Sequence, residues 1–184
     1  RAGLGGDWGF KTFPEYLDLI ERQGIAINVG VLLGHTPIRL EVMGEDAVRR
    51  AATPEEISEM SDIIREGMSA GALGFATSHA PTHHGFGGHP VPSRLAPMEE
   101  LDELVGAMAE SRRGILQATV GRTLFHEEFR SLASHHDIPI TWTALLAGMS
   151  GPGSHRRHQA QALELIKDGL NVVPQISCRP LNFD

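Results

Sequence analysis

Residues 71–94 hold the densest group of side chains that could carry out chemistry. Four of the ten histidines of the chain lie there: His79, His83, His84 and His89. Thr77 and Ser78 come just before them. An imidazole can transfer protons near neutral pH or bind a metal ion, and a hydroxyl can donate a hydrogen bond to a substrate carbonyl. We therefore expect Thr77, Ser78 and His83 to contact a substrate. The histidine spacing fits no fixed metal-binding pattern.

The placement of this stretch supports a functional role. Residues 72–78 are small, apolar and bounded by glycine, which is typical of a strand buried on both faces of a parallel sheet. Residues 79–94, called the histidine loop below, are rich in proline and glycine and cannot continue that strand. Loops at the carboxyl ends of parallel strands carry the active sites of α/β proteins. The histidine loop could form the rim of a site or a mobile lid.

There are three further candidates, two before this stretch and one at its last position. His35 follows an earlier apolar segment and is predicted to be catalytic in proton transfer, unless it merely bonds to backbone at the strand end. Arg39 could clamp a substrate carboxylate with its planar fork of donors. The alternative for Arg39 is a salt bridge to Glu41 or Asp46. Arg94 is predicted to reach a substrate anion, although a surface salt bridge is the commoner role for such a residue.

Strand-like and helix-like segments alternate along the chain. The predicted strands cover residues 28–33, 72–78, 114–120, 138–146 and 171–178. The predicted helices cover residues 14–23, 54–70, about 97–108, 124–135 and 155–168. Such alternation predicts an α/β protein whose parallel sheet has right-handed crossovers. We expect residues 1–184 to be the central part of a single barrel domain, incomplete at both ends.

Both an open doubly wound sheet and part of a (β/α)8 TIM-like barrel fit this alternation. Neither a Gly-x-Gly-x-x-Gly motif nor a Walker-type loop follows a predicted strand, so no nucleotide fingerprint favours the open sheet. Polar residues follow several predicted strands, and in a barrel these strand ends meet at one mouth. The pattern favours a partial TIM-like barrel, roughly strands 3 to 7 with their helices.

The composition limits which classes of binding partner and which cellular compartment are expected. The formal net charge of −7 argues against non-specific nucleic-acid binding, which needs clustered basic residues. The single cysteine, Cys178, excludes an intrachain disulfide framework and favours a reducing, cytoplasmic location. The sequence shows neither an apolar run long enough for a membrane span nor a signal-peptide pattern. Because the chain begins with Arg1, we expect it to be an internal piece of a longer protein.

Several runs occur in order along most of the chain. They include Gly34-His35-Thr-Pro-Ile-Arg39, Arg50-Ala-Ala-Thr-Pro-Glu-Glu56, Ala70-Gly-Ala-Leu-Gly-Phe-Ala-Thr-Ser78 and Pro90-Val-Pro-Ser-Arg94. Together these runs resemble the D-aminoacylase, or N-acyl-D-amino-acid deacylase, branch of the amidohydrolase superfamily. The resemblance implies a barrel enzyme that uses zinc or another divalent metal to hydrolyse the amide bond of an N-acyl amino acid.

The resemblance does not supply a metal site within this chain. The family's His-x-His pair and its catalytic aspartate belong to strands outside these residues. Thr119 and Ala144 stand where the family places two further metal histidines. Neither side chain can replace an imidazole on zinc. The metal ligands are therefore unknown: they lie outside the segment, come from the histidine loop, or have been lost.

Two other readings remain open. The chain could belong to a non-catalytic barrel that binds a small ligand, or to an unrelated phosphate-binding barrel, for which residues 148–154 are a poor candidate loop. The expected partner is a small N-acyl amino acid or related amide, with no nucleic acid and no membrane, and a homo-oligomer is compatible with the sequence. The helical histidines are expected on the surface: His126, His135, His136, His155 and His158.

Overall fold

Five parallel strands form one sheet in the computed structural model, which describes residues 9–148 and 150–178. They are β1 (Leu33–Gly34), β2 (Gly74–Ser78), β3 (Ile115–Thr119), β4 (Ile140–Thr143) and β5 (Val172–Pro174). Strands that are consecutive in sequence are neighbours in the sheet, and each of the four pairs is parallel. The predicted parallel sheet is therefore confirmed.

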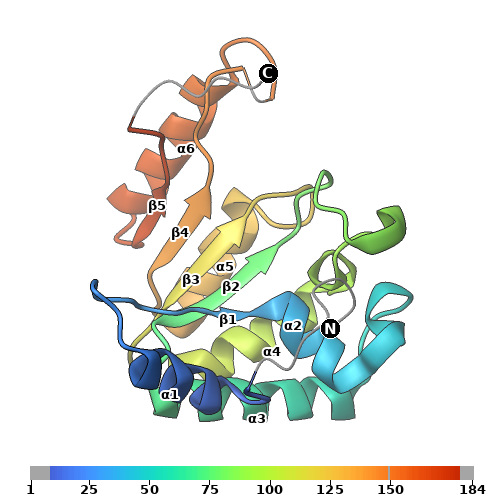
Figure 1. Cartoon of the computed structure of the whole chain (residues 1–184). Helices are drawn as coiled ribbons and strands as arrows, with labels where there is room; N and C mark the ends of the chain where they lie inside the picture. Colours follow the sequence, from blue (N-terminus) through green and yellow to red (C-terminus); the bar gives the residue numbers. More distant parts are fainter. Residues whose placement is uncertain (1–8, 149, 179–184) are drawn as a thin grey trace.

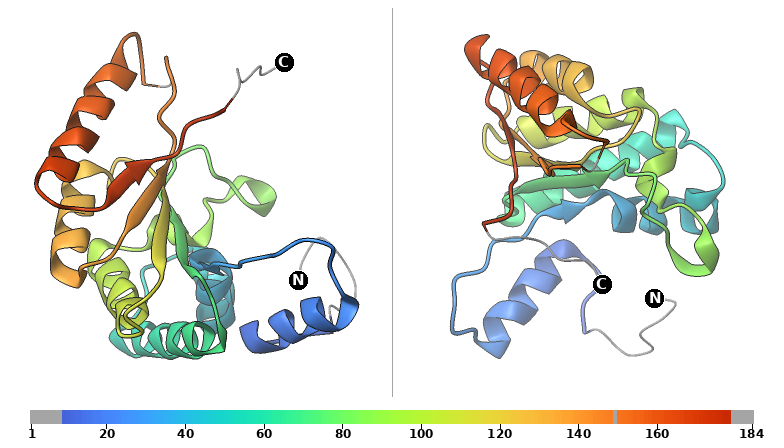
Figure 2. Two further views of the ribbon diagram at one scale, coloured as in Figure 1. Left: turned by 90° about the vertical axis from the view of Figure 1, so that its left-hand side faces the viewer. Right: turned by 90° about the horizontal axis from the view of Figure 1, so that it is seen from above.

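The described residues also form six α-helices. They are α1 (Phe13–Gln23), α2 (His35–Met43), α3 (Pro54–Ala70), α4 (Met98–Ala109), α5 (His126–His136) and α6 (Ser154–Lys167). Figure 2 shows α3 to α6 as an arc outside the strands. None of the helices described is long and apolar enough to cross a membrane.

The strand order decides between the two predicted architectures. An open doubly wound sheet reverses its strand order at a switch point, which places helices on both faces. Here the order follows the sequence from β1 to β5 (Figure 1). With right-handed crossovers, such an order places every connecting helix on the same face, as in a barrel wall. The partial TIM-like barrel is confirmed, and the open sheet is wrong.

Local signals in the sequence account for the long helix α3. Thr53 caps its amino end, where its side chain accepts a hydrogen bond from the backbone N–H of Glu56, and the Glu56 carboxylate accepts one from the backbone N–H of Thr53. Pro54 occupies the first helical position, where its missing N–H costs nothing. Gly71 ends the helix in the left-handed region, at φ 112°. The helix has the predicted bounds, residues 54–70.

The first predicted strand and the segment after it differ from the prediction. Of residues 28–33, only Leu33 belongs to the ladder, and the strand continues to Gly34. Helix α2 then begins at His35, which the sequence did not indicate. Pro37 lies in its first turn, where proline is tolerated. The buried face of α2 includes the charged Arg39, so its apolar periodicity is weak. The last two strands are also shorter than predicted.

Alternation along the strands separates two sets of side chains. Those facing the helices are fully buried in the core: Phe75, Leu116, Ala118, Ile140 and Trp142. The residues between them face the opposite side of the sheet, which is the inner side of a barrel, and are partly exposed. In β2 this inner set includes Ala76 and Ser78, whereas Thr77 points toward the helices.

Candidate active site

A hollow of about 210 Å³ opens at the carboxyl ends of β1, β2 and β3. Its walls are the inner residues of these strands, the start of α2 and Ser93 from the histidine loop. The arrowheads of the strands mark this end of the sheet in Figure 1. The hollow is therefore at the mouth of the barrel wall, where parallel barrels place their chemistry.

A buried polar network lies beside the hollow, between β2 and α4. His35 Nδ1 is 2.8 Å from Thr77 Oγ1, and His35 Nε2 is 2.9 Å from Glu100 Oε1. The Nη1 of Arg39 donates to both carboxylate oxygens of Glu100. The Nη2 of Arg39 donates to the carbonyl of Arg50 at 2.9 Å. The side chains of His35, Arg39 and Glu100 are all fully buried.

The charges in this network follow from burial and pairing. Burial lowers the pKa of His35, although the adjacent Glu100 opposes the change. Burial alone would raise the pKa of Glu100, but hydrogen bonds from His35 and Arg39 bring it below its ordinary value. Glu100 is therefore a carboxylate paired with Arg39, and His35 is neutral. Nε2 of His35 then donates to Glu100, and Nδ1 accepts from the hydroxyl of Thr77.

Three residues that the sequence analysis assigned to the site belong to this buried network. His35 and Thr77 border the hollow, but their polar side-chain atoms bond to each other and to Glu100. Arg39 is paired with Glu100, so the alternative salt bridge to Glu41 or Asp46 is wrong. A substrate carboxylate could engage Arg39 only by displacing one of its protein partners. The catalytic role of His35 and the substrate contacts of Arg39 and Thr77 remain predictions.

A second polar cluster includes the remaining three predicted residues. Ser78 Oγ is 2.6 Å from His83 Nδ1. The Nη1 of Arg94 donates to the carbonyl of His83 at 2.9 Å. Ser93 Oγ donates to the carbonyl of Ser78 at 2.8 Å. The structure thus brings Ser78, His83 and Arg94 together, with Ser78 in the wall of the hollow, and their roles toward a substrate also remain predictions.

Hydrogen bonds within the histidine loop give it a defined shape. The backbone N–H of Gly85 donates to the carbonyl of His89 at 2.7 Å, and the N–H of Val91 donates to that of His83 at 3.4 Å. His84 and Pro90 form an antiparallel bridge between the two arms. The loop is therefore a small hairpin whose two ends are tied to each other and to the end of β2.

Two other histidines are buried away from the hollow. His79 Nδ1 is 2.9 Å from Thr123 Oγ1, whereas its Nε2 has no partner among the described residues. His126 packs edge-on to Trp142, with ring centroids 5.6 Å apart. The expectation that His126 lies on the surface is wrong, because only 5% of the residue is exposed. The amphipathic pattern of α5 could not show that α6 covers this position.

These two histidines predict a loss of stability in acid. Burial lowers the pKa of His79 and of His126 to about 4, from an ordinary 6.5. The unfolded chain therefore takes up these protons at a higher pH than the folded chain. Stability is fully present above the unfolded pKa and falls as the pH decreases from about 6.5 toward 4. Each histidine contributes about 3 kcal/mol over that range.

Urea denaturation at about pH 7.5 and about pH 5 measures this effect. The substitution His126→Leu is expected to remove about 2 kcal/mol of the stability lost between these two conditions. His84→Gln is the control, because His84 is exposed. An unchanged pH dependence in His126→Leu would contradict the assignment.

The inner polar residues of β3 and β4, together with Gln175 after β5, do not form a zinc site. Gln117 Nε2 donates to Thr143 Oγ1 at 3.1 Å, and Thr143 Oγ1 donates to Gln175 Oε1 at 2.9 Å. Amide and hydroxyl groups are poor zinc ligands compared with imidazole, thiolate and carboxylate. In residues 9–148 and 150–178, one group of three potential metal ligands occurs, and it lies outside the mouth. The residues present at the strand ends therefore do not fit the implied metal.

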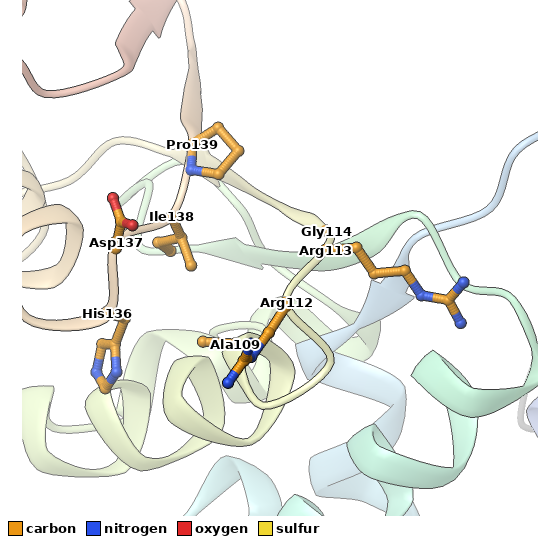
Figure 3. A pocket seen from close by; sticks show the side chains of 8 residues that line it. All are labelled: Ala109, Arg112, Arg113, Gly114, His136, Asp137, Ile138 and Pro139. Atoms are coloured by element: carbon orange, nitrogen blue, oxygen red, sulfur yellow. The ribbon is translucent and has the colours of Figure 1, made fainter.

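A second cavity, of about 320 Å³, lies at the opposite end of the strands. Its lining residues come from the ends of α4 and α5 and from the turns that lead into β3 and β4 (Figure 3). They include Arg112, His136 and Asp137. Because this cavity is at the amino ends of the strands, it is separate from the hollow at the mouth.

Comparison with curated proteins finds related sequences. D-aminoacylase from Alcaligenes xylosoxydans xylosoxydans is 35% identical over 143 residues, which are 74% of this chain and 27% of that protein. N-acyl-D-aspartate deacylase from the same organism is 31% identical over 139 residues, which are 76% of this chain and 24% of that protein. The chain thus spans about a quarter of the length of these relatives. No family model matches it.

Solved structures share the fold. A D-aminoacylase mutant in complex with CuCl2 superimposes with a TM-score of 0.73 and 22% identity over 89% of this chain and 33% of that one. N-acyl-D-glutamate deacylase from Bordetella bronchiseptica, complexed with zinc and a phosphonate inhibitor, gives a TM-score of 0.71 and 24% identity. That match covers 92% of this chain and 34% of that one.

Proposed function

The chain belongs to the D-aminoacylase branch of the amidohydrolases, and from this premise we propose that the protein removes the acyl group from N-acyl D-amino acids or closely related amides. The relatives that are 31–35% identical support this proposal, and they confirm the resemblance seen in the sequence motifs. The observation that carries it is the hollow at the mouth, which is lined by Ser78, and the contact between the hydroxyl of Ser78 and the imidazole of His83. We also propose that residues 1–184 belong to one barrel domain whose partner is a small amide.

In this proposal the cluster at the rim contacts the substrate. The hydroxyl of Ser78 can donate a hydrogen bond to the carbonyl of the scissile amide. His83, 2.6 Å away, can exchange a proton with that hydroxyl or with the leaving amine. The guanidinium of Arg94 adds positive charge beside His83, which suits the carboxylate of an N-acyl amino acid.

The buried network has a different role in this proposal. His35, Arg39 and Thr77 position the end of β2 and the start of α2, because their polar atoms are held by Glu100 and by each other. Ser78 directly follows Thr77, so fixing the hydroxyl of Thr77 on the helix side orients Ser78 toward the hollow. These three residues would then act on catalysis through Ser78 rather than on the substrate.

None of the residues assigned so far is proposed as a ligand of the catalytic metal. Zinc or copper is present in the related structures, but the side chains at the ends of β3 and β4 do not fit zinc. We propose that any catalytic zinc is held by residues other than Thr119 and Ala144. The same observation favours a second candidate function, a barrel that binds an N-acyl amino acid without hydrolysing it.

An amide-hydrolysis assay with paired D- and L-N-acyl amino acids, with and without a chelator, tests the proposal. We expect hydrolysis of the D-compounds and a fall in activity with the chelator. His83→Gln is expected to lower kcat/KM by about tenfold or more, because proton transfer and a hydrogen bond to Ser78 are lost. His84→Gln is the matched control, since His84 Nδ1 contacts only the nearby carbonyl of Thr82 at 3.0 Å.

The outcomes separate the two candidate functions. If His83→Gln hydrolysed the substrate at the full rate, the proposed catalytic role of His83 would be wrong. If calorimetry showed binding of an N-acyl amino acid and the assay showed no hydrolysis, the deacylase would be rejected. The second candidate function, a binding protein, would then be supported.

A further inference from the structure

We propose that Asp102, His135 and His136 bind a divalent transition-metal ion of the zinc class on the outer helical layer. Asp102 comes from α4, and the two histidines are the last residues of α5. One ligand atom from each of the three lies within 4.8 Å of the others. Two imidazoles and one carboxylate are a common zinc set, with water completing the coordination. This site does not depend on the proposed function.

The distances are close to those of a metal-bound set. His136 Nε2 is 2.9 Å from Asp102 Oδ1, and His135 Nδ1 is 3.3 Å from the same oxygen. Atoms bound at about 2.0–2.1 Å to a tetrahedral zinc ion are separated by about 3.3 Å. A metal ion could therefore enter with small side-chain movements, replacing the protons that these contacts now share.

The convergence of two neighbouring histidines needs a local explanation. Consecutive side chains of a regular α-helix point about 100° apart. Here α5 ends, and Asp137 adopts the left-handed conformation at φ 51°. The rings of His135 and His136 lie with centroids 4.3 Å apart and an interplanar angle of 31°. The helix end thus lets both imidazoles face the carboxylate of α4.

The surface of α4 provides room for one of the rings. Gly106 lies one turn after Asp102, and a Cβ at that position would be 3.2 Å from Cε1 of His136. A glycine within a helix costs roughly 0.5–1 kcal/mol relative to alanine. Here its missing side chain lets the imidazole pack against α4. The ring is therefore held, with only 12% of its side chain exposed.

The open side of the cluster leaves space for a water ligand. The side chain of His135 is 66% exposed and that of Asp102 is 35% exposed. His136 also borders the cavity of about 320 Å³ at the amino ends of the strands (Figure 3). A metal ion can therefore reach the cluster from solvent without any rearrangement of the core.

The cluster is separate from the candidate active site. Asp102 follows Glu100 by two residues, so their side chains leave α4 about 200° apart. Glu100 points to His35 and Arg39, whereas Asp102 points to α5. An ion at the cluster would link α4 to α5 and stabilise the folded protein. It would not take part in amide hydrolysis.

Zinc binding to the whole protein tests the proposal. The protein is treated with a chelator, dialysed against Zn²⁺ and analysed for bound metal by mass spectrometry. We expect the wild-type protein to hold one more equivalent of zinc than Asp102→Asn. His136→Gln is expected to bind that equivalent about tenfold more weakly or worse, since loss of an outer partner alone costs at least this much. Glu103→Gln is the matched control, because Glu103 is exposed on the same helix.

A second measurement separates metal binding from a structural role. Zinc should raise the thermal midpoint of the wild-type protein and of Glu103→Gln, but raise that of Asp102→Asn less. Deacylase activity measured in parallel reports on the mouth and not on this cluster. Equal zinc content and equal thermal shifts in Asp102→Asn and Glu103→Gln would overturn the proposal and leave a hydrogen-bonded cluster without a metal.

Discussion

Glu100→Gln is expected to destabilise the protein by about 3–5 kcal/mol, because it removes one partner of a buried ion pair. Arg39 would then keep its charge in a fully buried position with neutral acceptors, such as the carbonyl of Arg50, and no carboxylate to neutralise it. His35 would also lose the carboxylate that accepts its Nε2–H. Urea denaturation at neutral pH measures the change in the free energy of unfolding.

Matched substitutions test this explanation. Glu99→Gln makes the same chemical change one residue earlier, at an exposed position of α4, and should cost less than about 0.5 kcal/mol. Arg39→Met combined with Glu100→Leu should be more stable than Glu100→Leu alone, because no unpaired charge then remains buried. If the double variant were no more stable than the single one, the charge on Arg39 would not explain the loss.

Gly74→Ala is the second substitution with a large expected effect. Gly74 lies in β2 opposite Ile115, at φ 147°, a conformation that alanine rarely adopts. A Cβ there would be 2.1 Å from the carbonyl oxygen of Ile115, so β2 and β3 could not keep their pairing. We expect a loss of at least about 4 kcal/mol, measured by thermal or urea denaturation.

The control for this substitution is Gly85→Ala. Gly85 lies in the histidine loop, and the nearest atom to a Cβ there is the carbonyl oxygen of His89 at 3.9 Å. Its φ of −95° is open to any residue. Gly85→Ala should therefore leave the stability nearly unchanged. If Gly74→Ala were as harmless as Gly85→Ala, the close approach of β2 and β3 at this position would be refuted.

Much of the fold could be predicted because its signals are local. The cap of α3 at Thr53, with Pro54 and Glu56, needs only neighbouring residues, and the helix has its predicted bounds, residues 54–70. The alternation of apolar strands with amphipathic helices likewise gave the parallel sheet. The barrel-like strand order followed from that alternation together with the polar strand ends.

The features that were not predicted depend on contacts between residues that are distant in the sequence. Helix α2 was missed because its buried face includes Arg39, which looks like a surface residue until Glu100 is placed against it. The sequence also did not identify Glu100 as the partner of Arg39. Glu100 is one of two acidic residues in the first turn of α4, where acidic residues are common. Nothing local separates it from Glu99, which is exposed.

The candidate site was predicted in part for the same reason. Ser78 and His83 were found because a polar, histidine-rich segment follows a buried strand, and the structure brings them to 2.6 Å. The orientation of Thr77 toward the helices depends on strand alternation, which gives two opposite faces but does not identify the inner one. The pairing of Asp102 with His135 and His136 joins two helices and has no signature in either one.

The hairpin form of the histidine loop has a consequence for how small molecules arrive. Ser93 fastens one end of the loop to the carbonyl of Ser78, and Arg94 fastens it to the carbonyl of His83. A rim tied in this way would keep its shape while small molecules enter and leave. Access to the hollow would then depend on the width and charge of a fixed entrance. Selectivity among competing substrates would come from how well each one fits this entrance, and not from the rate at which the loop opens.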